Sequence, residues 1–142
     1  MRVYFDSSAF AKRYIDEAGT AEVLSWCERA GELALSVMVV PELVSAFCRL
    51  QREGRLTTDQ YLRIKHDFLA DLTDALICDT NPLVVQRAVS VLEAHALRGI
   101  DAVHIGAALT CEANVFVSAD APQCAAAKGE WLTNRGIVKR RQ

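Results

Sequence analysis

The chain has 142 residues, of which 51% are hydrophobic and 24% charged, and its net charge is −2. This size and balance predict a single domain over residues 1–142 with an ordinary core, and they argue against a second domain. The longest uncharged stretches, at 33–41 and 102–111, are about half as long as the roughly 20 apolar residues of a membrane-spanning helix, so we expect no membrane association. The start of the chain lacks a secretion-type apolar segment, which favours a cytoplasmic location.

The five cysteines are odd in number and widely spaced, and no Cys-x-x-Cys pair or histidine neighbour completes a zinc set. We therefore expect small, buried, apolar cysteines in a reducing compartment. The slightly negative net charge does not exclude a nucleic-acid partner. If several carboxylates were gathered in one metal site, the rest of the surface would carry a small positive charge.

Strand and helix patterns alternate along the first half of the chain. A β-branched and aromatic run at 2–5 stops at Asp6-Ser7-Ser8, a sequence typical of a helix N-terminus. Thr57 and Gln60 have the spacing of a capping box. The expected elements are a strand at 2–5, a helix at 20–30 capped by Thr20, a strand at 33–37, a helix from Pro41 to Gly54, and a helix from Thr57.

The alternation continues through the second half. Asn81-Pro82 caps and opens a helix for which we expect Val85, Val89 and Leu92 on the inner side and Gly99 at the end. The other expected elements are strands at 75–78 and 115–117, an apolar helix at 102–113 begun by Asp101, a helix at 122–132 and a short edge strand at 137–138.

Short apolar strands that alternate with amphipathic helices predict an α/β fold with a mainly parallel sheet covered on both faces. In such sheets, ligands bind beyond the carboxyl ends of the strands. Asp6 and Asp120 each follow a predicted strand, whereas Glu42 and Asp101 each lie in the first turn of a predicted helix. All four acids can therefore face the same crevice.

Taken singly, each of these acids could be a helix cap or a partner of the helix dipole. Taken together the four acids indicate a cation site. Two like charges about 5 Å apart repel by about 3 kcal/mol at an effective dielectric near 20, so a cluster of carboxylates needs compensation. Four clustered carboxylates would take up protons or hold a cation. An oxygen-only set selects Mg²⁺ or Mn²⁺, and such an ion is suited to phosphodiester hydrolysis.

Four short motifs in order resemble the PIN-domain ribonucleases, and among them the VapC-type toxins of bacterial toxin–antitoxin pairs. They are Asp6-Ser7-Ser8 after the first strand, Glu42 early in a helix, the segment from Arg98 to His104 opening an apolar helix, and Val117-Ser118-Ala119-Asp120 after a strand. The likeness extends from Val3 to about Val138. Its most specific part is Asp101-Ala102-x-His104 after an Arg-Gly pair.

The resemblance implies a three-layer α/β/α sandwich and an acidic tetrad of Asp6, Glu42, Asp101 and Asp120 that holds Mg²⁺ or Mn²⁺. It also implies metal-dependent cleavage of RNA, a homodimer, and a small antitoxin whose segment covers the active site. Ser118 stands where the family often has threonine, and this replacement keeps a hydroxyl near Asp120. The segment after Asp120 supplies no further acid, so a single metal ion is expected.

Other polar residues have weaker signals. Ser8, and Ser118 near Asp120, can orient carboxylates from an outer shell. His104 lies one helical turn after Asp101, and we expect it to be packed against a backbone carbonyl, although it could approach the crevice. Candidates for phosphate contacts are Arg13, Arg49, Arg52, Arg55, Arg98 and the tail Lys139-Arg140-Arg141.

Three other classes of protein are alternatives to a PIN-domain ribonuclease. A phosphorelay receiver would need an acid paired with Asp6, and a haloacid-dehalogenase-type phosphatase would need Asp-x-Asp, but Ser7 and Ser8 occupy those positions. The third is a PIN-like module that binds RNA or protein without cleavage or toxin activity. The intact acid set argues against it, and RNA cleavage in the presence and absence of metal would separate the two.

Overall fold

The computed structural model describes residues 1–130 and 134–136. The edge strand expected at 137–138 and the basic tail at 139–141 lie outside the described residues, as does the end of the helix expected at 122–132. No helix in the described part of the chain is long and apolar enough to span a bilayer.

In the described residues, five parallel strands form one sheet in the order β3-β2-β1-β4-β5. The chain adds strands on one side of β1 and then returns to add β4 and β5 on the other, so the direction of winding reverses between β1 and β4. That is where ligands bind in open α/β sheets. The strands are β1 (Arg2–Phe5), β2 (Glu32–Ser36), β3 (Leu76–Cys78), β4 (Val115–Ser118) and β5 (Asn134–Gly136).

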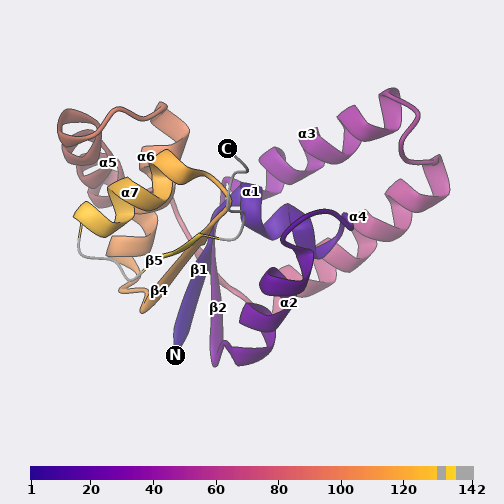
Figure 1. Cartoon of the computed structure of the whole chain (residues 1–142), viewed down its shortest axis with the longest axis horizontal. Coiled ribbons are helices and arrows are strands. Elements are labelled where there is room, and N and C mark those ends of the chain that lie inside the picture. The colour runs from indigo at the N-terminus through magenta and orange to yellow at the C-terminus, as the bar shows by residue number, and fades with distance from the viewer. Residues whose placement is uncertain (131–133, 137–142) are drawn as a thin grey trace.

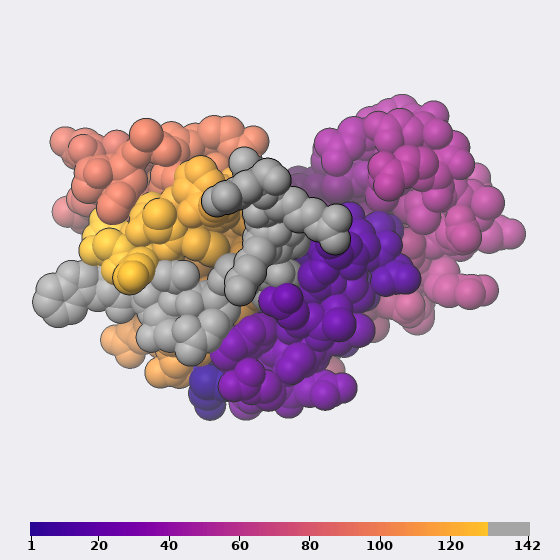
Figure 2. Space-filling model, in the orientation of Figure 1, coloured from indigo at the N-terminus to yellow at the C-terminus, as the bar shows by residue number. Residues whose placement is uncertain are grey.

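Helices cover both faces of this sheet, as Figure 1 shows. One layer contains α1 (Ser7–Phe10), the 3₁₀ turn η1 (Ala11–Arg13), α2 (Thr20–Arg29), α3 (Val39–Arg52) and α4 (Thr58–Thr73). The other contains α5 (Pro82–Ala94), α6 (Gly99–Thr110) and α7 (Ala121–Gly129). In Figure 2 the ends of α3 and α4 form a lobe that projects from the body of the molecule. The predicted α/β fold is confirmed.

The alternation of side chains along β1 supplies one core to each layer. Val3 and Phe5 pack with Phe10, Phe47 and other residues of the first layer. Tyr4 points to the opposite face and packs with the α5, α6 and α7 side chains. Because β1 is covered on both sides, its last residues are buried and hold the segment that follows in a fixed position.

The inner face of α5 differs from the prediction by one residue. Val84, Ala88 and Val91 are buried, whereas Val85 and Val89 are 47% and 49% exposed. The helix is apolar on both sides, so the spacing alone fits either stripe. The stripe with the small Ala88 faces inward because α5 packs very closely on Gly106 of α6.

Some helix boundaries also differ from the prediction. Gly99 does not end α5, which stops at Ala94; it is instead the first residue of α6. Helix α2 is capped by Gly19, with a φ of 97°, and Thr20 is its first residue. Helix α3 begins two residues before Pro41. The capping box of Thr57 and Gln60 and the Asn81 cap are present as predicted.

Candidate functional site

Asp6 is buried at the carboxyl end of β1, where its exposed fraction is 2%. Its Oδ1 accepts a hydrogen bond from the Ala9 amide at 2.8 Å and so caps α1. Ser8 donates to both carboxylate oxygens at 2.9 Å, and Ser118 at the end of β4 donates to Oδ2 at 2.6 Å. The structure thus places both predicted serines against Asp6.

Burial makes the charge of Asp6 unfavourable. It raises the pKa of the Asp6 carboxyl, although the charge of His104 and the hydrogen bonds of Ser118, Ala9 and Ser8 act in the opposite direction. Within the described residues, no lysine or arginine forms an ion pair with Asp6. A cation next to this carboxylate would remove the cost of its burial.

Asp101 lies in the first turn of α6 and is 8% exposed. The guanidinium of Arg98 donates to both of its oxygens, from Nε at 3.0 Å and from Nη2 at 3.2 Å. The Arg98 side chain is 77% exposed. One acid of the predicted tetrad is therefore neutralised by an arginine that has most of its surface in solvent.

Glu42 lies in the first turn of α3 and is half-buried. Its Oε1 accepts from Ser7 Oγ at 2.7 Å and lies 2.7 Å from His104 Nε2. Burial acts to raise the pKa of Glu42, but the hydrogen bond and charge of His104, followed by the Ser7 bond, outweigh it and lower that pKa. Glu42 is therefore held as a carboxylate.

His104 is buried, as predicted, but its partners are side chains and not a backbone carbonyl. Its Nδ1 lies 2.7 Å from the hydroxyl of Tyr4, which belongs to β1. Burial raises the pKa of Tyr4 well above its ordinary value, so this hydroxyl stays protonated and can donate to Nδ1. Nε2 then carries the proton that points to Glu42.

Asp120 follows β4 and caps α7 through a bond from the Gln123 amide to Oδ1 at 3.2 Å. The side chain of Gln123 is buried and bridges three elements, because Nε2 donates to the Asp101 carbonyl at 3.1 Å and Oε1 accepts from Ser118. Sequence reasoning missed Gln123. Its signal was the spacing of Asp120 and Gln123, which is that of a cap and its third helical residue.

All four acids line one small cavity of about 100 Å³. Its lining residues are Asp6, Ser7, Ser8, Glu42, Arg98, Asp101, His104, Asp120 and Gln123. Parallel strands end at the same edge of a sheet, and that brings Asp6 and Asp120 together. The first turns of α3 and α6 supply Glu42 and Asp101.

The donor chemistry of this cavity fits a hard divalent ion, because the acids supply only oxygen ligands. In the described structure, however, no group of three or more His, Cys, Asp or Glu side chains is arranged to hold a metal ion. The Asp101 carboxylate is hydrogen-bonded to Arg98, and the Asp120 carboxylate caps the N-terminus of α7. A metal ion at Asp101 would compete with the Arg98 pair, and one at Asp120 would compete with the bond from the Gln123 amide.

Arg13 lies outside this cavity, in contrast to Arg98. Its guanidinium donates to Asp71 of α4 from Nε at 2.9 Å, and the hydroxyl of Tyr14 donates to the same Asp71 oxygen at 2.6 Å. Arg13 is part of the packing between η1 and α4 and does not join the acids.

Comparison with known proteins gives matches over most of the chain. A family model described as PIN domain matches residues 3–129. Ribonuclease VapC45 of Mycobacterium tuberculosis is 31% identical over 107 residues, which are 75% of this chain and 74% of that protein.

Two solved structures share the fold at low sequence identity. The M. tuberculosis toxin VapC20, a sarcin-ricin loop cleaving toxin, has a TM-score of 0.66 and 16% identity over 87% of this chain and 94% of its own. VapBC2 of Rickettsia felis, bound to a DNA fragment from its promoter, has a TM-score of 0.66 and 12% identity over 96% and 98% of the two chains.

Proposed function

Because the chain belongs to the PIN-domain family, and within it to the VapC-type ribonucleases, we propose that it is a metal-dependent endoribonuclease that acts as the toxin of a toxin–antitoxin pair. The observation that carries the proposal is the cavity in which Asp6, Glu42, Asp101 and Asp120 meet at the carboxyl edge of the sheet. The proposed nuclease is a single domain over residues 1–142, and its substrate is RNA.

The four acids would hold Mg²⁺ or Mn²⁺. When bound, such an ion neutralises charge on the phosphate and activates water for attack. Ser8 and Ser118 keep the Asp6 carboxylate in one orientation through the bonds already described, and His104 does the same for Glu42. Arg98 lies at the same cavity with an exposed guanidinium, which suits it to position a phosphodiester.

The proposal is tested by incubating the purified protein with RNA in Mg²⁺ or Mn²⁺ and then adding excess EDTA. Cleavage should stop with EDTA and return when metal is restored. Asp101→Asn keeps the shape of the side chain but removes its charge, and we expect it to reduce cleavage by at least about 100-fold while the circular dichroism spectrum is unchanged.

A matched control is Asp59→Asn, which makes the same change at an exposed acid in the first turn of α4. This variant should cleave RNA as the wild type does. Cleavage that survives EDTA, or full activity in Asp101→Asn, would reject a metal-dependent acid site. Absence of cleavage with either metal would favour the alternative, a PIN-like module that binds RNA or protein without cutting.

The acid-lined cavity also supports the proposal of an antitoxin protein as a partner. A basic segment of a small antitoxin is complementary to it, because a cation from the partner could take the position of Arg98 on Asp101. The test is co-expression with the protein of a small neighbouring reading frame. That protein should bind the wild type and inhibit cleavage, and RNA cleavage at the full rate in the complex would contradict the assignment.

A further inference from the structure

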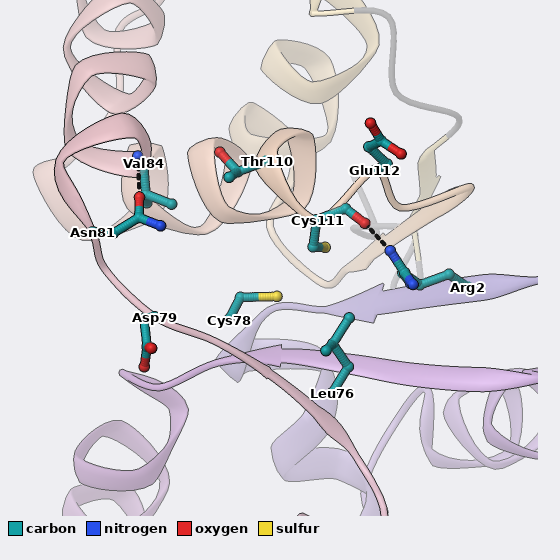
Figure 3. Close-up of a pocket in the computed structure, with 9 residues that line it drawn as sticks. All are labelled: Arg2, Leu76, Cys78, Asp79, Asn81, Val84, Thr110, Cys111 and Glu112. Atoms are coloured by element: carbon teal, nitrogen blue, oxygen red, sulfur yellow. Dashed lines mark hydrogen bonds between the residues drawn. The ribbon is translucent and has the colours of Figure 1, made fainter.

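A second cavity, unrelated to the acid site, lies between β3 and the C-terminal end of α6. Its volume is about 350 Å³, and none of the described residues lines both cavities. Figure 3 shows its lining, with Cys78 and Cys111 on opposite walls and Arg2 beside Cys111. The remaining lining residues are Leu76, Asp79, Asn81, Val84, Thr110 and Glu112.

The two thiols face one another across this cavity. Cys78 is the last residue of β3 and Cys111 is the C-cap of α6, where its Sγ donates to the Ala108 carbonyl at 3.5 Å. All five cysteines are half-buried, whereas the sequence predicted mostly buried ones. Two thiols that line the same cavity can be reached by a small oxidant.

The surroundings make the two sulfurs chemically different. The interaction with Cys78 lowers the pKa of the Cys111 thiol, burial opposes this, and the nearby charge of Arg2 lowers it further. The guanidinium of Arg2 is fixed there because it donates to the Cys111 carbonyl and pairs with Glu32. The pKa of Cys78 is raised by its interaction with Cys111 and by burial. Because the Arg2 guanidinium lies at Cys111, it favours the Cys111 thiolate over that of Cys78.

We propose that Cys78 and Cys111 form a redox-active pair that a peroxide converts into a disulfide between β3 and α6. The Cys111 thiolate attacks a peroxide oxygen of H₂O₂, and the O–O bond breaks to leave a sulfenic acid and hydroxide. The sulfur of Cys78 then displaces the hydroxyl group from the Cys111 sulfur. Overall, two thiols and one H₂O₂ give one disulfide and two water molecules.

The other three cysteines provide internal controls. Burial is the main cause that raises the pKa of Cys27 and of Cys124, which disfavours their thiolates. Cys48 contacts the hydroxyl of Tyr61. None of the three is hydrogen-bonded to another cysteine in the described part of the chain, so each would lack a resolving partner.

The experiment exposes the full-length reduced chain to hydrogen peroxide and follows free thiols under denaturing conditions, together with the intact mass. The thiol count should fall from five to three, the mass should decrease by about 2 Da, and one peptide should contain both Cys78 and Cys111. Dithiothreitol should restore all five thiols. The triple variant Cys27→Ser, Cys48→Ser, Cys124→Ser should form the same disulfide at the wild-type rate.

Single variants separate the roles of the two sulfurs. Cys78→Ser should stop at a sulfenic acid on Cys111, trapped by dimedone, whereas Cys111→Ser should react at least about 10-fold more slowly than the wild type. Retention of five thiols under these conditions, or a disulfide that links other cysteines or two chains, would overturn the proposal. RNA cleavage is not used as a readout, so failure here is independent of the proposed nuclease activity.

Discussion

Arg98 would compete with a metal ion for the Asp101 carboxylate. Its side chain donates to both oxygens of that acid while most of its surface stays in solvent. We expect Arg98→Ala to bind Mn²⁺ about 2- to 5-fold more tightly in calorimetry, because an exposed ion pair competes only weakly. The control is Arg55→Ala, at an arginine that is also exposed and lies near Glu53. Unchanged or weaker Mn²⁺ binding in Arg98→Ala would show that Arg98 does not compete for Asp101.

The Asp71 carboxylate stabilises the fold and lies outside the acid-lined cavity. Burial acts to raise its pKa, but the hydrogen bonds of Arg13 and Tyr14, with the Arg13 charge, outweigh it, so the pKa lies below its ordinary value of 3.8. The ionised group therefore stabilises the fold above about pH 4, and this contribution is lost as the pH falls through the folded-state pKa.

Asp71→Asn should lower the free energy of unfolding by about 1 kcal/mol at pH 7, since the hydrogen bonds to the carboxylate are only partly screened. Urea titrations at several pH values should show this difference shrinking between pH 4 and pH 2. Asp67→Asn, on the same helix with its side chain 61% exposed, should change stability little at any of these values. A difference for Asp71→Asn that grows on acidification would contradict the assignment.

Sequence reasoning located individual acids better than it located their partners. Asp6 and Asp120 could be found because each follows a strand, and the carboxyl ends of parallel strands share one edge. The contacts of Glu42 with His104, and of His104 with Tyr4, join residues far apart in the chain. Neither spacing nor composition carries that information, and the Arg98 pair with Asp101 was likewise not anticipated.

At the scale of elements, the pairing of α5 and α6 depends on Gly106. A Cβ at this position would lie 2.7 Å from the Val84 carbonyl oxygen and 3.2 Å from the Ala88 amide nitrogen. Both neighbours are backbone atoms, so the helices would have to separate. Gly106→Ala should therefore destabilise the protein by about 1–3 kcal/mol, measured by urea unfolding.

Gly99 provides a matched control on the same helix, because a Cβ there would meet no atom within 4 Å. Gly99→Ala should leave stability unchanged or raise it by up to about 1 kcal/mol, since alanine loses less entropy in a helix. Equal effects of the two substitutions would show that close helix packing at Gly106 contributes nothing.

The prediction for α5 was wrong by one residue for a related reason. The helix has valine and leucine on two adjacent stripes, and only the packing surface of α6 decides which stripe is buried. By contrast, the capping signals at Thr57 and Asn81 are local, and the structure confirms both. Strand order is not local, and the sequence pattern predicted the parallel sheet without predicting which strands are neighbours.

On the scale of the whole molecule, the outward stripe of α5 is an apolar surface that supports the expected homodimer. Val85, Val89 and Leu92 share this stripe and are 47%, 49% and 37% exposed. Light scattering after gel filtration should give twice the chain mass of 15.6 kDa. Val89→Lys should shift the protein toward the monomer, because the dimer would bury the ammonium group.

Leu62→Lys places the same charge on the outer surface of α4, at a leucine that is 53% exposed. It should leave the dimer intact. A wild type that elutes as a monomer, or a dimer that is unaffected by Val89→Lys, would contradict a dimer interface on α5.

Titration with Mn²⁺, followed by electron paramagnetic resonance of the free ion, tests most directly whether the four acids form one cation site. We predict one bound Mn²⁺ per chain, with affinity reduced at least about 10-fold by Asp6→Asn and by Asp101→Asn and unchanged by Asp59→Asn. Wild-type affinity in both cavity variants would contradict a shared cation site, as would RNA cleavage by a protein that binds no Mn²⁺.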